Sequence, residues 1–152
     1  MGRIVCVANQ KGGVGKTTTA SNVAAGLAKA GMQTLLVDLD PQCNATTGLG
    51  GIPAETHPLV SEAALGENVV STAVTNLSLL PGSRSVRDVE RIADQARAGS
   101  MVLSNHLSCG LNAWDYCLID CPPSLGELTR TALAGSTEVL MPIQCEYFAL
   151  EG

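Results

Sequence analysis

The start of the chain constrains the fold more than any other part of the sequence. Residues 3–8 read RIVCVA, a β-branched apolar run that predicts a buried strand. A glycine-rich loop follows, with glycines at positions 12, 13 and 15. Residues 16–30 are rich in Ala and Leu and predict a helix, which Gly31 would end as a C-cap. A strand, a tight glycine loop and a helix in this order are typical of α/β folds.

The loop has the composition of a phosphate-binding loop, with one departure from the usual pattern. The pattern G-x-x-x-x-G-K-[ST] is met at Gly15, Lys16 and Thr17, but Gln10 occupies the place of the first glycine. Glycine lets backbone N–H groups point inward, and the helix N-terminus adds partial positive charge. We expect Lys16 to reach the β- and γ-phosphates, Thr17 to ligate Mg²⁺ and Thr18 to contact the α-phosphate. A glycine turn without a ligand is the alternative, and the adjacent GKTT disfavours it.

Further apolar runs alternate with helical segments along the chain. Four more buried strands are predicted, at residues 33–38, 76–80, 116–120 and 138–143. Two helices are predicted at residues 59–65 and 86–98, and two loops at residues 40–51 and 100–110. Such alternation predicts βαβ units. The expected fold class is therefore α/β, a doubly wound parallel sheet with helices on both faces.

Two of the predicted strands lead into aspartates. Asp38 and Asp40 follow one apolar run, and Asp120 ends another. Because the carboxyl ends of parallel strands form the ligand crevice, these carboxylates can face a bound phosphate. Asp120 would reach Mg²⁺ from a neighbouring strand, and Asp38 would bind Mg²⁺ through water or hold the loop. Asp40 would orient the attacking water. The alternatives are a turn residue for Asp40 and a turn or helix cap for Asp38.

The size, charge and cysteine content of the chain limit the class of protein to which it can belong. Its 152 residues, 45% of them hydrophobic and 3% aromatic, suffice for one domain with an aliphatic core. The net charge of −5 argues against a nucleic-acid surface spread over these residues. No run of about 18 apolar residues occurs, so no membrane span is expected. The six cysteines form no C-x-x-C pair, which favours reduced, mostly buried thiols in a cytosolic protein; Cys6, Cys117 and Cys145 lie in or beside apolar runs.

Several segments resemble the ParA/MinD group of P-loop ATPases. KGGVGKTT, residues 11–18, is similar to the deviant Walker A motif of that group, and Lys11 corresponds to its signature lysine. In the family this lysine contacts the nucleotide across a sandwich dimer. The segments DLDPQCNATTGLG, IDCPPSLGELTRTAL and VLMPIQCEYFALEG resemble the ParA/Soj subgroup, except that Cys43 stands where glycine is usual. Residues 52–110 match only loosely.

The resemblance implies an ATP hydrolase that acts as a slow molecular switch in chromosome or plasmid partition. Its cofactors would be ATP and Mg²⁺. Its partners would be a second copy in an ATP-dependent homodimer, a ParB-like protein that stimulates hydrolysis, and non-specific DNA. The implied nucleotide-binding residues are Lys11, Gly12, Gly13, Val14, Gly15, Lys16, Thr17 and Thr18. The implied catalytic residues are Lys11, Lys16 and Asp40, and the implied metal ligands are Thr17, Asp38 and Asp120. The protein would be cytoplasmic and nucleoid-associated, without membrane contact.

Residues 1–152 are expected to form the N-terminal part of a single P-loop ATPase domain. Only nine residues follow the apolar run at 138–143, and an uncovered apolar strand is an aggregation hazard. We therefore expect the natural protein to continue past Gly152, where its DNA-binding and adenine-contacting residues would lie. Because the glycine loop begins so close to the N-terminus, the chain resembles the short ParA form, which has no N-terminal helix-turn-helix domain.

Two other classes share the glycine loop. A membrane-recruited positioning ATPase like MinD would share both loop lysines, Asp40 and Asp120. The segment PQCNATTGLG is similar to ParA, however, and differs from the GLRN-type segment of MinD. An Fe–S carrier or reductase like the nitrogenase iron protein would use cysteines in glycine-rich loops, whereas Cys121 and Cys145 lie in ParA-type segments. A non-hydrolysing relative is the remaining alternative.

Overall fold

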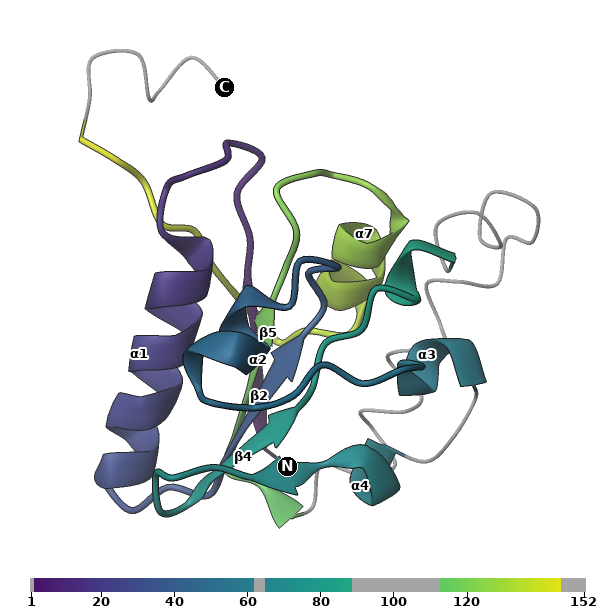
Figure 1. Cartoon of the computed structure of the whole chain (residues 1–152). Helices are drawn as coiled ribbons and strands as arrows, with labels where there is room; N and C mark the ends of the chain where they lie inside the picture. Colours follow the sequence, from purple (N-terminus) through teal and green to yellow (C-terminus); the bar gives the residue numbers. More distant parts are fainter. Residues whose placement is uncertain (1, 62–64, 89–112, 146–152) are drawn as a thin grey trace.

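The computed structural model of the chain describes residues 2–61, 65–88 and 113–145 (Figure 1). At its centre is a sheet of six strands in the order β3-β4-β2-β5-β1-β6. The strands are β1 (Arg3–Val7), β2 (Thr34–Asp38), β3 (Val70–Ser71), β4 (Leu77–Leu80), β5 (Tyr116–Asp120) and β6 (Glu138–Leu140). The helices bounded within these residues are α1 (Lys16–Lys29), α2 (Asn44–Gly48), α3 (Pro58–Ser61), α4 (Leu65–Asn68) and α7 (Glu127–Ala134).

The sheet is parallel except at one edge. β1 pairs in parallel with β5 and β6, and β2 pairs in parallel with β4 and β5. The register places Asp120 opposite both Val7 and Asp38, so the carboxyl ends of the three central strands are level. This arrangement confirms the predicted α/β class. The antiparallel strand β3 is not predicted by the sequence, because its two residues are both exposed and carry no apolar pattern.

Helices cover both faces of the sheet. Alternate side chains of each strand point to opposite faces, and both faces carry apolar side chains that pack against helices. On one face, the core includes Ala20, Ala24 and Ala28 of α1. On the other face, it includes Leu59 of α3 and Ala132 of α7. Figure 1 shows α1 and α7 on different sides of the central strands. This sandwich leaves the carboxyl ends of the strands as the place where loops gather.

Helix α1 begins where the glycine loop ends. Gly15 has φ 85° and Gly31 has φ 91°, values in the left-handed region that favours glycine, and they flank the helix at its two ends. The buried alanines of α1 recur every four residues, which lets the helix backbone lie close to the sheet. The observed range Lys16–Lys29 confirms the helix predicted at residues 16–30.

The segment predicted as a loop at residues 40–51 contains the short helix α2, and that prediction is wrong in part. The carboxylate of Asp38 accepts hydrogen bonds from the backbone N–H of Thr46 at 2.8 Å and from its hydroxyl at 2.6 Å. The N–H of Thr47 donates to the carbonyl of Cys43 at 3.1 Å. Buried anchoring of this kind gives a polar, glycine-rich segment a helical turn that its composition does not predict.

The strand predicted at residues 138–143 is shorter and more exposed than expected. It ends at Leu140, because β1 gives way to the glycine loop and Pro142 has no N–H to donate. β6 is an edge strand, and Val139, Met141 and Ile143 are 52%, 57% and 53% exposed rather than buried.

Two predicted helices lie partly outside the described residues. Of the helix predicted at residues 59–65, residues 59–61 belong to α3 and residue 65 begins α4, whereas residues 62–64 lie outside the described residues. A helix begins at Val86, as predicted. The rest of the predicted helix at 86–98 and the predicted loop at 100–110 lie outside the described residues, apart from residues 87 and 88.

The cysteines are mostly buried, as the sequence predicts. Cys6, Cys43, Cys117 and Cys121 are buried, whereas Cys145 is exposed although it lies beside an apolar run. Cys109 lies outside the described residues. Across the described ranges, no helix combines the length and the apolar character needed to cross a membrane.

Candidate nucleotide-binding site

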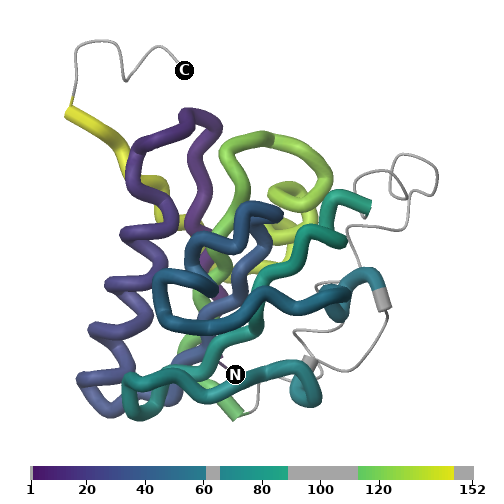
Figure 2. Tube along the Cα trace, in the orientation of Figure 1, coloured from purple at the N-terminus to yellow at the C-terminus, as the bar shows by residue number. Residues whose placement is uncertain are grey.

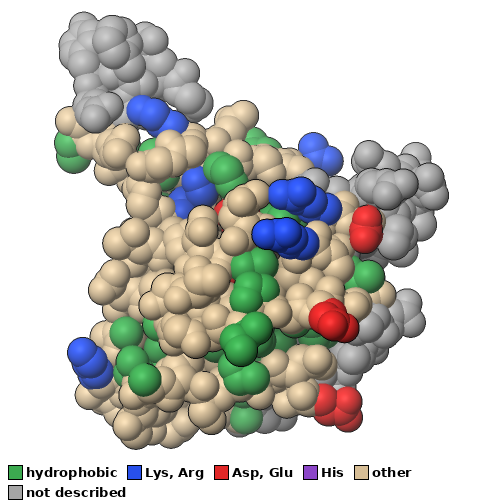
Figure 3. Space-filling model, viewed as in Figure 1, with side chains coloured by type: hydrophobic (Ala, Val, Ile, Leu, Met, Phe, Trp, Pro, Cys, Tyr) green, Lys and Arg blue, Asp and Glu red, His purple; other side chains and the backbone are tan. Residues whose placement is uncertain are grey.

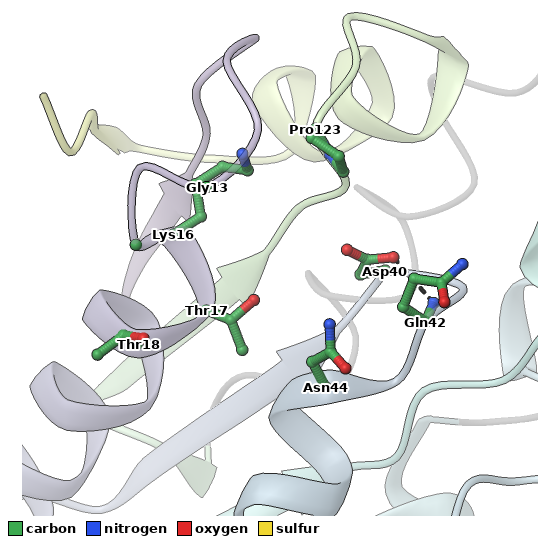
Figure 4. Close-up of a pocket in the computed structure, with 9 residues that line it drawn as sticks. Gly13, Lys16, Thr17, Thr18, Asp40, Gln42, Asn44 and Pro123 are labelled. Carbon is green, nitrogen blue, oxygen red and sulfur yellow. Dashed lines mark hydrogen bonds between the residues drawn. The ribbon is translucent and has the colours of Figure 1, made fainter. Parts of the chain in front are cut away.

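A pocket of about 390 Å³ lies at the carboxyl end of the sheet, within the range common for small-molecule sites. It brings together three segments that are distant in sequence, which Figure 2 shows as the purple loop before α1, the blue segment before α2 and the green segment after β5. The residues that line it are Gly13, Gly15, Lys16, Thr17, Thr18, Asp40, Gln42, Asn44 and Pro123 (Figure 4). The glycine loop and the segment after β2 therefore form one site.

The glycine loop presents backbone groups to this pocket. Gly13 and Gly15 have φ values of 74° and 85°, a conformation that favours glycine at both positions. In the described part of the chain, no side chain caps the N-terminus of α1. The first N–H groups of a helix have no partner within the helix, and together they carry a partial positive charge. This end of α1 can therefore bind an anion such as a phosphate.

Lys16 is held inside the loop. Its side chain is almost fully buried, and its Nζ donates a hydrogen bond to the carbonyl of Lys11 at 2.8 Å. An ammonium group in this position is a ready donor for an anion that enters the pocket. In the face shown in Figure 3, the Lys and Arg side chains gather mainly in the upper half. Both features favour an anionic ligand.

Asp120 is a buried carboxylate with no hydrogen-bond partner in the described part of the chain. Its side chain is 0% exposed, and neither oxygen has a partner. Burial, together with the charges of Asp38 and Asp40, raises the pKa of Asp120 to about 7. Thr17 and Lys16 oppose this shift in pKa, although the Thr17 hydroxyl does not complete a hydrogen bond of normal geometry. Such a group gains most from a bound cation.

The donors around Asp120 fit Mg²⁺. Carboxylate and hydroxyl oxygens are ligands of the kind that Mg²⁺ prefers, and Thr17 supplies a hydroxyl beside the carboxylate. Within the described ranges, no cluster of three or more His, Cys, Asp or Glu could hold a metal ion. Mg²⁺ commonly keeps several waters and binds through one or two carboxylates together with substrate phosphates.

Asp38 holds the switch segment, residues 40–44, against the sheet. It is completely buried and does not line the pocket. Besides its two bonds from Thr46, it accepts a hydrogen bond from the backbone N–H of Asp40 at 3.2 Å. Burial raises its pKa, and the hydrogen bonds from Thr46 oppose that shift. These contacts match the loop-holding role, and the expected role as a metal ligand stays a prediction.

Asp40 faces the pocket across from the glycine loop (Figure 4). One carboxylate oxygen accepts a hydrogen bond from the N–H of Gln42 at 2.9 Å, and its carbonyl accepts one from Cys43 at 2.8 Å. The turn role considered for Asp40 is therefore present in the structure. Asp40 also lines the pocket, and its expected role in orienting the attacking water stays a prediction.

Three of the expected nucleotide-binding residues do not line the pocket. Lys11 is exposed, and its backbone N–H donates to the Oδ1 of Asn9 at 2.9 Å. Gly12 is exposed, and Val14 is buried. Their backbone groups belong to the loop, but their expected contacts with a nucleotide stay predictions.

Sequence reasoning missed three residues that line the pocket. Gln42 and Asn44 flank Cys43 in the switch segment, and Pro123 follows β5. Their positions in the sequence could have identified them. Each lies within four residues of one of the predicted acids, after the end of a strand, where parallel sheets place their ligands.

The fold and this pocket define a P-loop nucleotide-binding protein with a parallel α/β sheet. A family model described as an AAA domain matches residues 2–152, and the chain belongs to this family. The chain is 44% identical over 157 residues to the sporulation initiation inhibitor protein Soj of Bacillus subtilis (strain 168), covering 100% of this chain and 62% of Soj. It is 45% identical over 159 residues to the chromosome partitioning protein ParA of Myxococcus xanthus (strain DK1622), covering 100% and 56%. These matches confirm the resemblance to ParA/Soj-type partition ATPases.

A solved structure has the same fold. The cobyrinic acid a,c-diamide synthase of Mycobacterium smegmatis with bound ADP and magnesium superposes with a TM-score of 0.93 and 37% identity, covering 100% of this chain and 63% of that one. The chain thus spans between 56% and 63% of the length of these three relatives.

Proposed function

We propose that the chain binds Mg-ATP in this pocket and hydrolyses it slowly, as the nucleotide switch of a chromosome or plasmid partition system. The observation that carries the proposal is the meeting of Lys16, Thr17 and Asp40 around one pocket, with the unpartnered carboxylate of Asp120 beside Thr17. The partition context rests on the relatives named Soj and ParA.

The glycine loop and Lys16 would bind the phosphates. Backbone N–H groups of the loop and of the first turn of α1 would surround the α- and β-phosphates. Lys16 would exchange the carbonyl of Lys11, which its Nζ contacts at 2.8 Å, for phosphate oxygens. The exchange costs little, because one hydrogen bond replaces another and the new one joins opposite charges.

Thr17 and Asp120 would hold Mg²⁺, with Asp38 as the further expected ligand. When bound, the ion neutralises charge on the phosphates. Asp120 would then be ionised, because a neighbouring cation lowers the pKa that burial now raises. Asp40 would accept a hydrogen bond from the attacking water and fix its direction.

The remaining parts of the proposal concern partners. Lys11 would contact the nucleotide of a second copy in an ATP-dependent homodimer; its exposed position at the mouth of the loop is compatible with a contact in trans. A ParB-like protein would stimulate hydrolysis, and the dimer would bind non-specific DNA. The protein would act in the cytoplasm, associated with the nucleoid.

The name of the Mycobacterium smegmatis structure suggests a second use of ATP, in amide formation. Both candidates need the same phosphate site, so the pocket does not separate them. Phosphate release from ATP without any carboxylate substrate separates them, because a switch ATPase hydrolyses ATP alone.

The direct test of hydrolysis is phosphate release from Mg-ATP by the parent and by Asp40→Ala. The proposal predicts slow release by the parent and a loss of about 10²-fold or more in the variant, with ATP binding retained. Asp88→Asn, at an exposed aspartate outside the pocket, is the control and should match the parent. Equal rates in parent and Asp40→Ala would remove Asp40 from the mechanism.

A further inference from the structure

The segment that follows β6 is hydrogen-bonded to the glycine loop. We call residues 141–145 the β6 extension. Just before it, the N–H of Ala8 donates to the carbonyl of Leu140 at 3.2 Å. Within it, the side chain of Asn9 donates to the carbonyl of Pro142 at 2.8 Å, and the Nε2 of Gln144 donates to the carbonyl of Gly13 at 3.2 Å. The extension therefore follows the chain from the end of β1 into the loop.

The alternation of side chains explains why Gln144 points at the loop. Val139, Met141 and Ile143 are all more than half exposed, so one side of the segment faces away from the protein. In an extended chain, successive side chains point to opposite sides. Gln144 follows Ile143 and so falls on the other side, where the loop lies. Its amide is placed by this alternation as well as by its own hydrogen bond.

The bond from Gln144 fixes the orientation of one peptide plane in the loop. The chain has no cis peptide bonds among its described residues, and in a trans peptide the C=O and N–H groups point in opposite directions. Because the carbonyl of Gly13 faces Gln144, the N–H of Val14 in the same plane points away from Gln144. In Figure 4 the segment after β6 (yellow) lies on one side of the loop, and Asp40 and Pro123 lie on the other. The N–H of Val14 is thus turned away from the β6 extension.

Glycine makes this peptide easy to rotate unless something holds it. Gly13 has φ 74°, and a Cβ placed on it would meet none of the described residues within 4 Å, so their packing does not restrain it. The loop is anchored at its start by Asn9, whose Oδ1 accepts from the N–H of Lys11 at 2.9 Å and whose Nδ2 donates to Pro142. Gln144 supplies a second anchor, at the centre of the loop.

We propose that Gln144 is a positioning residue of the phosphate site, which holds the Gly13–Val14 peptide so that the N–H of Val14 is available to a bound phosphate. The proposal rests on the proposed nucleotide-binding function and deepens it. Gln144 itself does not touch the ligand and acts through the loop backbone. Without this bond, the peptide would rotate more freely, and binding would have to restore its orientation at a cost in affinity.

The test compares two substitutions at Gln144 with a matched control. Gln144→Met keeps the length of the side chain but removes the donor, and Gln144→Glu replaces the donor with a negative charge facing the carbonyl of Gly13. Gln33→Met is the control, because Gln33 lies outside the pocket and its Nε2 also donates one hydrogen bond, to the Oδ1 of Asn76 at 3.1 Å. Calorimetric titration with Mg-ADP gives the affinity, and thermal unfolding without nucleotide gives the stability.

We expect Kd for Mg-ADP to rise about three- to tenfold in Gln144→Met and further in Gln144→Glu, since one hydrogen bond is worth about 1 kcal/mol. The melting temperature without nucleotide should stay that of the parent, and Gln33→Met should bind as the parent does. The amide proton of Val14, followed by NMR, should shift on ADP binding in the parent and less in Gln144→Met. A purely structural role would leave that shift unchanged.

The outcomes separate the two proposals. If the folded parent does not bind Mg-ADP, the nucleotide-binding function is wrong, and the role of Gln144 with it. If the parent binds but Gln144→Met has the same Kd and the same Val14 shift, the role of Gln144 is overturned and the proposed function stands.

Discussion

Asp38 and Asp120 lie directly opposite each other in the register of β2 and β5, yet their carboxylates differ in hydrogen bonding. Asp38 accepts hydrogen bonds from Thr46 and from the backbone of Asp40. Asp120 accepts none from the residues that the structure describes, although both side chains are completely buried. The protein itself supplies the hydrogen bonds of Asp38, so of the two carboxylates Asp120 gains more from a bound cation.

The first prediction concerns the pH dependence of stability. The pKa of Asp120 is about 7 in the folded chain against an ordinary value of 3.8, so the folded state holds the proton more tightly than the unfolded state. The protonated Asp120 carboxyl contributes its full stability below about pH 4, and this contribution is lost as the pH rises to about 7. Asparagine does not ionise, so the stability of Asp120→Asn does not fall for this reason over the same pH range. Without Mg²⁺ or nucleotide, the free energy of unfolding of Asp120→Asn relative to the parent should therefore rise by roughly 2–4 kcal/mol between about pH 4 and pH 7.

Urea unfolding at several pH values measures this difference. A difference between Asp120→Asn and the parent that does not change with pH would show that Asp120 is ionised normally in the folded chain.

The second prediction concerns the anchoring of α2. The hydroxyl of Thr46 donates to Asp38 at 2.6 Å and accepts from the N–H of Gly82 at 2.8 Å, so Thr46→Val leaves two buried groups with fewer partners. We expect a loss of about 2–4 kcal/mol in the free energy of unfolding. Thr47→Val is the matched control, because Thr47 is exposed and its hydroxyl donates to backbone carbonyls of the same turn. Its cost should stay below about 1 kcal/mol. Equal losses in the two variants would contradict the anchoring role of Thr46.

The third prediction concerns the backbone at Cys43. This residue has φ 56° and ψ 34°, a left-handed conformation that costs a non-glycine residue about 1 kcal/mol or more. Cys43→Ala loses the buried thiol and keeps the strain, whereas Cys43→Gly loses the thiol and relieves the strain. Thermal unfolding should therefore show Cys43→Gly to be more stable than Cys43→Ala by about 1 kcal/mol, the reverse of their order in a helix interior. A more stable Cys43→Ala would mean that the strain at this position is absent.

The fourth prediction concerns thiol reactivity. Cys145 is exposed, whereas Cys6, Cys43, Cys117 and Cys121 are buried, and burial raises the pKa of Cys117 to about 12. Because the thiolate is the reactive form, brief treatment with iodoacetamide should label Cys145 and leave the four buried thiols unlabelled until urea is added. Peptide mapping by mass spectrometry reads each site separately. Rapid labelling of Cys117 in the folded chain would contradict the packing of β5.

The glycine loop at the pocket could be predicted from sequence largely because its parts are local. The spacing of Gly15, Lys16 and Thr17 after an apolar run defines the loop and the start of α1 without any knowledge of the rest of the chain. Asp120 could be placed beside the loop because the ends of parallel strands meet at one edge of the sheet. These inferences need only periodicity and topology.

The parts that could not be predicted depend on contacts between distant residues. α2 is anchored by a buried bond between Asp38 and Thr46, and neither residue signals a helix by its own propensity. The exposure of Val139 follows from the place of β6 at the sheet edge, which the order of strands along the chain does not specify. The contact between Gln144 and Gly13 joins residues 131 positions apart, and no local pattern marks it.

Whether this pocket binds nucleotide is decided by a calorimetric titration of Mg-ATP into the parent chain and into Lys16→Ala, with a circular dichroism melt of each. We expect saturable binding by the parent and a loss of affinity of about 10²-fold or more in Lys16→Ala, with both chains melting cooperatively. Equal affinity in the two chains, or no binding by a cooperatively folded parent, would contradict the claim that this pocket is a nucleotide site.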